Sequence, residues 1–427
     1  MQEKELSYDK VFCDIAEGFD VKKAQRESSR CYYCYDAPCI AACPTGIDIP
    51  SFIRKISNGN NRGAAIDILS ANIMGGTCAR ACPVETLCEA ACVREKSEKE
   101  PVTIGQLQKY AVDEFLKTNE RPFKQGKLNG LKVAVVGAGP SGLSCAHRLA
   151  TLGYSVTIFE AQEKSGGLNE YGLAPYKLTN NFAQKEIEFI LSVGGIKIEN
   201  KKALGRDLKL SDLTAKYAAV FLGIGLTSVN KLDIPGEELS IVSDAVKFIA
   251  KIRQTKDLTK IPVAQNVVVI GGGNTAVDIA IEMKKIGAEN VTIVYRRGFE
   301  NMGATHHEQE LAQKNGVLIK TWGVPKKIYK ESIEFESQGQ TYSLKAGQIF
   351  KAIGQKLDLA VLGPEAQGIQ VKQGKVFVNP DFETSLKNVF AGGDITGIGE
   401  DLTVTAVQQG KLAAEGIDRK LKGDRHG

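Results

Sequence analysis

The 427-residue sequence contains no run of eighteen or more apolar residues, so it predicts no membrane-spanning helix. Its first stretch, MQEKELSYDKVF, lacks the apolar core and small-residue cleavage site of a secretory signal. Neither sign of charge is in large excess, since 55 Lys and Arg stand against 50 Asp and Glu and are spread along the chain. Such a balance gives little support for binding nucleic acid or an anionic membrane. We therefore expect a cytoplasmic protein without either partner.

Groups typical of hydrolytic catalysis are also missing. The sequence shows no Ser/His/Asp arrangement and no spaced pair of carboxylates, and His306 and His307 lie in a polar stretch that predicts an exposed loop. No FMN-binding barrel and no substrate pocket with a catalytic cysteine loop can be found. We expect no catalytic side chain in the strict sense, because cofactors can carry hydride and electron transfer while the protein positions them.

Cysteine, in contrast, is abundant and clustered. Nine of the ten cysteines fall in the first hundred residues. In a chain of this size without a secretory signal, such clustering indicates metal binding instead of disulfides. Eight of them form two runs: Cys31, Cys34, Cys39 and Cys43, then Cys78, Cys82, Cys88 and Cys92.

Two kinds of metal site could use these thiols. Cys-x2-Cys runs ending in Cys-Pro are typical of iron–sulfur proteins, and the first run ends in Cys43-Pro44. Structural zinc on the same thiolates is the alternative, but zinc motifs are usually paired Cys-x2-Cys knuckles. The spacing therefore favours iron–sulfur clusters, which carry electrons.

The chain has three predicted parts. Short helices interrupted by Gly, Pro and Cys fill residues 1–122, with Arg62–Ala71 and Thr103–Leu116 the clearest. This region has few apolar residues, so bound metal is expected to supply much of its folding energy. A polar linker, Asn119–Gly130, then precedes two strand–helix–strand units at Leu131–Glu160 and Gln265–Arg297.

The sequence thus predicts an α+β multidomain protein with an N-terminal helical iron–sulfur domain and two Rossmann-like α/β nucleotide-binding domains. The expected boundaries are 1–122 for the helical domain, 131–240 and 380–427 for the first nucleotide domain, and 241–379 for the second.

The first strand–helix–strand unit has the glycine pattern of a dinucleotide site. Gly137, Gly139 and Gly142 allow a tight turn, close approach to a pyrophosphate and close helix–strand packing. Glu160 ends the second strand, where it can accept a hydrogen bond from a ribose 2′-OH. The chain here resembles flavoprotein reductases, which place FAD in the first fold and close a C-terminal Gly-Gly-Asp turn over it. The predicted FAD residues are Gly137, Gly139, Pro140, Ser141, Gly142, Glu160, Gly166, Gly167, Leu168, Lys177, Gly393, Asp394, Thr403, Val404 and Thr405.

The second unit is predicted to bind NAD(P)H. Its second strand ends in Arg296 and Arg297 instead of an acid, and arginine can bind a 2′-phosphate. This pair favours NADP(H) over NAD(H), while NAD remains open because it tolerates arginine. The predicted residues are Gly271, Gly272, Gly273, Asn274, Thr275, Ala276, Arg296, Arg297, Ile353 and Gly354.

The order of these motifs resembles a known family. The cysteine domain, GAGPSG, GGLNEYG, GGGNTAVD and AGGD occur in this order in the glutamate synthase small-subunit superfamily. The chain is most similar to the flavin and iron–sulfur subunits of bacterial NAD-dependent dihydropyrimidine dehydrogenases, over nearly its full length. The gap of five residues between Cys82 and Cys88 distinguishes it from glutamate synthase small subunits, which usually have a shorter one.

The resemblance also implies a set of ligands. It places one 4Fe–4S cluster on Cys31, Cys34, Cys39 and Cys92, and a second on Cys43, Cys82, Cys88 and Gln108. Spacing alone would favour Cys78 as the fourth ligand of the second cluster, so that choice stays open. If Gln108 is the ligand, Cys78 and Cys13 are ordinary small apolar residues.

The implied activity is that of an electron-input subunit. NAD(P)H would reduce FAD, and electrons would pass through two 4Fe–4S clusters to a partner that carries FMN and further clusters and interconverts uracil or thymine with the 5,6-dihydropyrimidine. The alternatives are a glutamate synthase small subunit, another ferredoxin-coupled NADPH oxidoreductase, a stand-alone NAD(P)H diaphorase, and a redox-sensing scaffold without enzymatic activity. The sequence does not name the terminal acceptor, the direction of flux or the oligomeric state.

Overall fold

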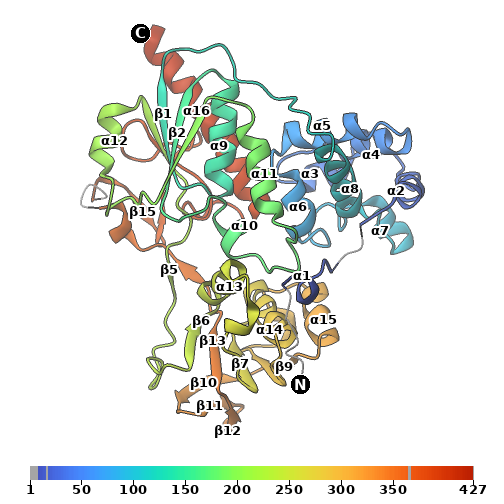
Figure 1. Cartoon of the computed structure of the whole chain (residues 1–427), viewed down its shortest axis with the longest axis vertical. Coiled ribbons are helices and arrows are strands. Elements are labelled where there is room, and N and C mark those ends of the chain that lie inside the picture. The colour runs from blue at the N-terminus through green and yellow to red at the C-terminus, as the bar shows by residue number, and fades with distance from the viewer. Residues whose placement is uncertain (1–7, 16–17, 364–366, 427) are drawn as a thin grey trace. The chain divides into compact units, whose positions relative to one another are not determined.

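The computed structural model describes residues 8–15, 18–363 and 367–426, and the chain forms two compact units (Figure 1). Unit 1 contains Met1–Ile15, Glu170–Asn180 and Ser228–Lys356. Unit 2 contains Ala16–Asn169, Asn181–Thr227 and Leu357–Gly427. In the part of the chain that the structure describes, no helix is both long and apolar enough to cross a membrane.

The N-terminal part of unit 2 is helical, as predicted. The two helices expected from the sequence are present at Asn61–Ala71 and Ile104–Leu116. Asp20, Asp48 and Asn60 each cap a helix by accepting a hydrogen bond from a backbone N–H three residues later. The helices of this region are α2 (Val21–Ser28), α3 (Pro38–Ala42), α4 (Ile49–Ser57), α5 (Asn61–Ala71), α6 (Gly75–Ala81), α7 (Val93–Glu98) and α8 (Ile104–Leu116).

This helical region has a larger core than the sequence predicted. Phe52, Ile53, Leu107 and Phe115 are almost completely buried and belong to one apolar cluster with the first sheet. Phe115 on α8 packs edge-on against Phe189 of the following α/β fold, with 6.1 Å between ring centroids. The helical region is therefore not short of core, because its helices share the core of the neighbouring fold. The contribution of bound metal to its folding energy stays a prediction.

The first nucleotide fold completes unit 2. Its five parallel strands lie in the order β17-β4-β1-β2-β3, and α9 packs along α16 beside them (Figure 1). Gly410 permits this helix contact, since a Cβ there would lie 2.0 Å from the Ser141 carbonyl oxygen. The elements are β1 (Lys132–Val136), α9 (Pro140–Thr151), β2 (Ser155–Glu160), α10 (Leu168–Tyr171), α11 (Phe182–Leu191), β3 (Ile196–Asn200), α12 (Leu210–Lys216), β4 (Ala219–Leu222), β15 (Val371–Lys372), β16 (Lys375–Val376), β17 (Val389–Ala391) and α16 (Thr403–His426).

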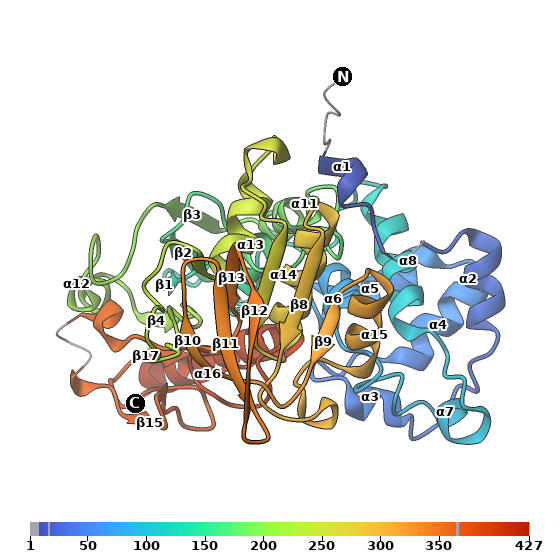
Figure 2. The same cartoon turned by 90° about the horizontal axis from the view of Figure 1, so that it is seen from below.

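Unit 1 contains the second nucleotide fold. Five parallel strands lie in the order β6-β13-β7-β8-β9, and three antiparallel strands, β10, β11 and β12, stand beside one another (Figure 2). His306 and His307 begin α15 instead of lying in the predicted loop, because Thr305 caps that helix. The elements are α1 (Tyr8–Val11), β5 (Ser228–Val229), β6 (Val242–Asp244), α13 (Ala245–Gln254), β7 (Asn266–Ile270), α14 (Asn274–Lys285), β8 (Asn290–Val294), α15 (His306–Lys314), β9 (Leu318–Lys320), β10 (Val324–Ile328), β11 (Ser332–Ser337), β12 (Gln340–Lys345), β13 (Gln348–Lys351) and β14 (Gln355–Lys356).

The boundaries between the two units differ from the domain boundaries expected from the sequence. The longest segment of unit 1 runs from Ser228 to Lys356, and its two ends pair with each other, because β5 and β14 form a two-stranded antiparallel ribbon. Residues 357–363 and 367–379 belong to unit 2, with the first nucleotide fold. The first described residues also belong to unit 1, where the ring of Phe12 is 2% exposed and joins the core around α13 and α14. The assignment of these segments to their units depends on contacts with residues far away in the sequence.

Candidate functional site: two cysteine groups and two nucleotide folds

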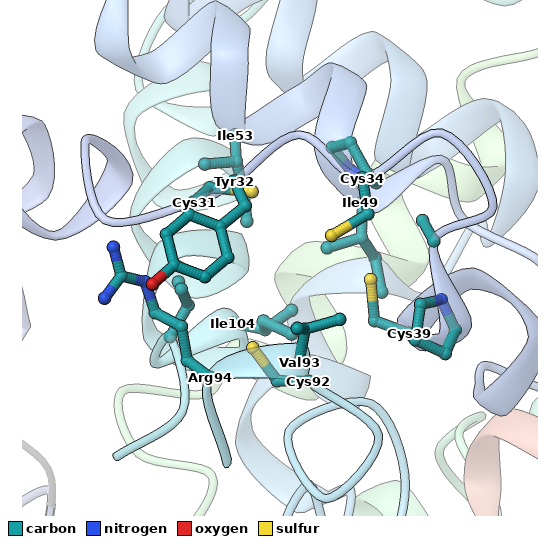
Figure 3. A pocket seen from close by; sticks show the side chains of 14 residues that line it. Cys31, Tyr32, Cys34, Cys39, Ile49, Ile53, Cys92, Val93, Arg94 and Ile104 are labelled. Atoms are coloured by element: carbon teal, nitrogen blue, oxygen red, sulfur yellow. The ribbon is translucent and has the colours of Figure 1, made fainter. Parts of the chain in front are cut away.

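Four cysteines that are far apart in sequence line one pocket. Cys31, Cys34, Cys39 and Cys92 surround it together with Ile49, Ile53, Val93 and Ile104. Figure 3 shows the cysteine sulfurs facing the same space, with Tyr32 and Arg94 at its edge. The turn after α2 and the start of α3 bring the first three, and the N-cap of α7 brings Cys92. This is the ligand set that the resemblance implied for the first cluster.

The four thiols surround a pocket, and this arrangement suits the predicted cubane cluster. Burial raises the pKa of Cys39 to about 12 and also raises the pKa of Cys31, so metal binding must release thiol protons.

A second group forms around α6. A hydrogen bond with Cys78, followed by burial, raises the pKa of Cys82 well above its ordinary value, and Cys88 and Cys43 add to the shift. These four thiols therefore lie together. Burial also raises the pKa of Cys88, with contributions from Cys43 and from Cys39 of the first pocket. The two groups are thus neighbours within unit 2.

Both candidates for the fourth ligand of the second group are close to α6: Cys78 is part of this helix, and Gln108 contacts its first residue. Gln108 on α8 is 7% exposed, and its Nε2 donates to the carbonyl oxygen of Gly75, the first residue of α6, at 2.7 Å. Cys78 is 2% exposed and lies one turn further along α6. Gln108 as a ligand stays a prediction.

Separate substitutions distinguish the two candidates. Gln108→Ala is expected to remove about half of the bound iron, since one of the two predicted cubanes would lose a ligand, whereas Cys78→Ala is expected to keep the full iron content. Iron analysis and electron paramagnetic resonance (EPR) of the reduced protein measure this. Iron loss from Cys78→Ala alone would transfer the assignment to Cys78.

The first glycine turn fits a dinucleotide. A Cβ on Gly142 would lie 1.9 Å from the Gly137 carbonyl oxygen, so α9 can approach β1 only with glycine there. Gly137 has a φ of +99°, which glycine alone adopts readily. Beside Gly139 the space is open, and the nearest atom to a Cβ there would be Gly167 Cα at 3.8 Å. A pyrophosphate can use this space at the N-terminus of α9.

Glu160 faces this turn from the end of β2. The side chain is 7% exposed, and its carboxylate accepts hydrogen bonds from the N–H groups of Ala138 at 2.7 Å and Gln162 at 2.8 Å. A carboxylate has further lone pairs for a ribose hydroxyl. Its position fits the predicted role.

The C-terminal Gly-Gly-Asp turn meets the same glycine turn. A Cβ on Gly393 would lie 2.8 Å from Ser141 Oγ, and the Gly393 N–H donates to Gln409 Oε1 at 2.7 Å. Burial raises the pKa of Asp394 to about 6. The remaining predicted residues of this set lie on neighbouring elements: Pro140 on α9, Gly166 and Leu168 at α10, and Thr403, Val404 and Thr405 on α16.

Sequence reasoning missed three residues that organise this region. Asn169 accepts a hydrogen bond from Thr403 Oγ1 at 3.0 Å and lies 3.7 Å from Met74 Sδ. Gln409 holds the Gly393 turn, and Lys411 on α16 reaches the end of α5. Asn169 could have been found, because it directly follows the Gly-Gly-Leu motif. The other two carry no motif.

The second glycine turn fits a nucleotide as well. Gly271 has a φ of +148°, and a Cβ there would lie 2.2 Å from the Ala352 carbonyl oxygen. No atom lies within 4 Å of a Cβ built on Gly273. At the N-terminus of α14, Asn274 Oδ1 is buried without a hydrogen-bond partner among the described residues, and a ligand hydroxyl could satisfy it. Thr275 and Ala276 follow on α14, while Ile353 and Gly354 follow β13. Arg296 and Arg297, after β8, are exposed.

Lys177, predicted with the FAD residues, instead forms a buried ion cluster in unit 1. Its Nζ lies 2.8 Å from Asp278 Oδ1 and 2.7 Å from Glu308 Oε1. Tyr176 donates its hydroxyl hydrogen to Asp278 at 3.0 Å. Asp278 is on α14 and Glu308 on α15, so we assign Lys177 to the internal packing of this unit.

Comparison with known proteins agrees with this architecture. Residues 131–410 match the pyridine nucleotide-disulphide oxidoreductase family, and residues 8–120 match dihydropyrimidine dehydrogenase domain II, a 4Fe–4S cluster domain. These two family matches identify the chain as a flavin-dependent oxidoreductase with an iron–sulfur domain. Among solved structures, thioredoxin reductase of T. acidophilum has a TM-score of 0.55 at 19% identity, covering 68% of this chain and 99% of that one. FprA of Mycobacterium tuberculosis in complex with NADPH has a TM-score of 0.57 at 18% identity, covering 70% and 86%. These two similarities concern the fold alone.

Curated relatives match nearly the whole chain. The NAD-dependent dihydropyrimidine dehydrogenase subunit PreT of Escherichia coli O157:H7 is 34% identical over 416 residues, covering 96% of this chain and 97% of the relative. The protein of the same name from Salmonella typhimurium is 33% identical over 412 residues with the same coverage. With both the iron–sulfur and the nucleotide folds in place, the chain belongs to the family of NAD-dependent dihydropyrimidine dehydrogenase subunits.

Proposed function

We propose that this chain is the electron-input subunit of a two-subunit dihydropyrimidine dehydrogenase. It would oxidise NAD(P)H and deliver electrons, through FAD and two 4Fe–4S clusters, to a partner subunit that carries FMN and reduces uracil or thymine. The observation that supports this most is the presence of two cysteine groups in the same compact unit as the first nucleotide fold. Bound FAD would link NAD(P)H to the clusters, since a flavin can accept two electrons as a hydride and release them one at a time.

The protein's own residues bind and orient in this scheme. Gly139 leaves room for a pyrophosphate, Glu160 accepts from a ribose, and Gly393 closes the site against Ser141. In the second fold, Gly273 and Asn274 take the corresponding positions for the nicotinamide nucleotide. The thiolates of the two cysteine groups fix the clusters. Positioning and control of potential, not acid–base catalysis, are therefore the tasks of the side chains.

The two cysteine groups suggest an order for electron flow. The second group lies around α6, which packs against α11 and α16 of the first nucleotide fold. Near the first group the surface includes Tyr35, fully exposed, and Tyr32 and Val93, which are partly exposed. We therefore assign entry to the second group and exit to the first, where aromatic side chains suit a protein partner.

The nucleotide preference is a separate prediction. The curated relatives are called NAD-dependent, while Arg296 and Arg297 favour a 2′-phosphate. On the arginine argument, flavin reduction is expected to have a higher kcat/KM with NADPH than with NADH. The variant with both arginines changed to Ala should lose roughly 10- to 100-fold with NADPH, as expected for one or two charge-assisted contacts, and change little with NADH. A much higher kcat/KM with NADH in the unmodified protein would refute the preference.

The partner can be identified directly. Anaerobic purification of the tagged chain from its own cells, with identification of the co-purified protein, is expected to recover a subunit with FMN and iron–sulfur clusters. The complex should then oxidise NAD(P)H when uracil or thymine is added. Recovery of a glutaminase-type large subunit instead would refute the pyrimidine assignment.

A further inference from the structure

The turn between α5 and α6 connects the second cysteine group to the first nucleotide fold. Helix α5 ends at Ala71 and α6 begins at Gly75. Helix α6 contains Cys78, and Cys82 is its C-cap. Two charged side chains of the nucleotide fold, Glu186 on α11 and Lys411 on α16, reach this turn.

Glu186 occupies the N-terminus of α6. Its side chain is 2% exposed, and Oε1 accepts hydrogen bonds from the N–H groups of Gly76 at 2.9 Å and Thr77 at 3.0 Å. Oε2 accepts from the Thr77 hydroxyl. The carboxylate therefore takes up N–H groups that an α-helix leaves free at its first turn, and its charge opposes the positive end of the helix dipole. These bonds span 110 residues of sequence.

The fit around Glu186 is close. A Cβ on Gly76 would lie 2.4 Å from Phe182 Cζ and 2.9 Å from Glu186 Oε1, so only glycine lets α11 approach α6 this closely. The Arg80 guanidinium lies 3.9 Å from the centre of the Phe182 ring and donates to both Asp113 oxygens on α8. Helix α6 is thus fixed on two sides.

Lys411 occupies the other end of the turn. Its Nζ donates to the carbonyl oxygen of Ala71 at 2.8 Å, at the last residue of α5, where a cation opposes the negative end of the helix dipole. Cys43 of the second group contributes electrostatically to the pKa of Lys411, so the ammonium and this thiol are near each other. Burial of Lys411 lowers that pKa.

We propose that Glu186 and Lys411 are positioning residues that hold the α5–α6 turn against the nucleotide fold and tune the cluster of the second cysteine group with opposite charges. This inference rests on the proposed function, since it requires a cluster on Cys43, Cys82 and Cys88. A negative charge near a cluster opposes its reduction and a positive charge favours it.

The test compares midpoint potentials in the full-length protein loaded with FAD and iron–sulfur clusters. Glu186→Gln keeps the size of the side chain and an oxygen acceptor for the N–H groups, and it is expected to raise the potential of one cluster. Lys411→Gln is expected to lower the potential of the same cluster. The other cluster should be unchanged in both variants. EPR-monitored redox titration at pH 8, above the pKa of about 7 to which burial raises Glu186, measures both clusters at once.

A matched control lies on the same helix. Glu188 on α11 is exposed, so Glu188→Gln makes the same change of charge in solvent and should move neither potential. Shifts of the same sign in the Glu186 and Lys411 variants, or equal shifts in both clusters, would overturn the proposal. So would a Glu186→Gln variant that behaves like Glu188→Gln.

Misfolding and failure of the proposed function are recognised separately. Iron content and the EPR line shape of the unaffected cluster verify that each variant is folded. If Glu186→Gln loses iron, Thr77→Val, which removes only the hydroxyl donor to Glu186, provides the second variant and should shift the same cluster alone. Unmodified protein with one cluster only would refute the two-cluster function before any variant is made.

Discussion

The Cys92→Ala variant is expected to lose the cluster of the first cysteine group and, under the proposed function, electron delivery to the partner subunit. Cys92 lines the same pocket as Cys31, Cys34 and Cys39, although more than fifty residues of sequence lie between it and them. Iron should fall by about half, since one of the two proposed cubanes loses a thiolate. Pyrimidine reduction by the proposed complex should fall at least about 100-fold, as removal of an obligatory carrier implies. Reduction of the flavin by NAD(P)H should persist, because the nucleotide folds keep all their residues.

The control is Cys13→Ala, which changes an exposed cysteine outside both groups. It should leave iron content and activity as they are. Iron analysis, the EPR spectrum and rapid-mixing measurements of flavin reduction give the three readouts. If Cys92→Ala keeps a full complement of iron, or loses the signal assigned to the second group, the interleaved arrangement of ligands is wrong.

The Lys177→Met variant is expected to destabilise unit 1 by roughly 3–5 kcal/mol, the usual cost of removing one partner from a buried ion pair. The side chains of Lys177, Asp278 and Glu308 are 8%, 6% and 15% exposed, so the two carboxylates would be left without their cation. Burial already raises the pKa of Glu308. The penalty should shrink at acidic pH, because protonation removes the uncompensated negative charge.

Unfolding of this unit has its own probe. The only tryptophan of the chain, Trp322, lies in unit 1, so tryptophan fluorescence during chemical denaturation reports on that unit. Lys314→Met provides the control, since Lys314 pairs with Glu310 on α15 but is 72% exposed, and exposed pairs contribute about 0–1 kcal/mol. Equal loss of stability in the two lysine variants would contradict a structural role for the buried cluster.

Much of the architecture follows from local pattern. The runs KVAVV and NVVVI, each followed by a glycine turn and an amphipathic helix, predicted β1–α9 and β7–α14 because these features lie within one short stretch. The helices at Asn61–Ala71 and Ile104–Leu116 were also predicted within one residue. The dihydropyrimidine dehydrogenase family, inferred from the order of motifs, is confirmed by the curated relatives.

Features that depend on contacts between distant residues were harder to predict from the sequence. The sequence placed Lys177 with the FAD residues because it follows the Gly-Gly-Leu motif, but its charge is neutralised by Asp278 and Glu308, more than a hundred residues away. The expected boundaries assign β5 and β14 to different domains and Phe12 to the helical domain, whereas in the structure β5 pairs with β14 and Phe12 is buried in unit 1. The periodicity of apolar residues in a segment predicts which of them are buried, but it does not predict the segment against which they pack.

The cysteine stretch shows which features the sequence predicts and which depend on the tertiary structure. Spacing and the Cys-Pro step predicted iron–sulfur ligands, because ligand chemistry is local, and the match of residues 8–120 to a 4Fe–4S cluster domain agrees with this prediction. The sequence also determined two nucleotide folds, through glycines that the backbone needs. The family resemblance implied that Cys92 joins Cys31, Cys34 and Cys39, and the tertiary structure places all four around one pocket. Only the tertiary structure decided that the helical region shares its core with the first sheet, and that Glu186 caps the helix that leads to Cys82. Each of these is a contact between segments far apart in the chain, and such contacts are chosen by the packing of the whole unit.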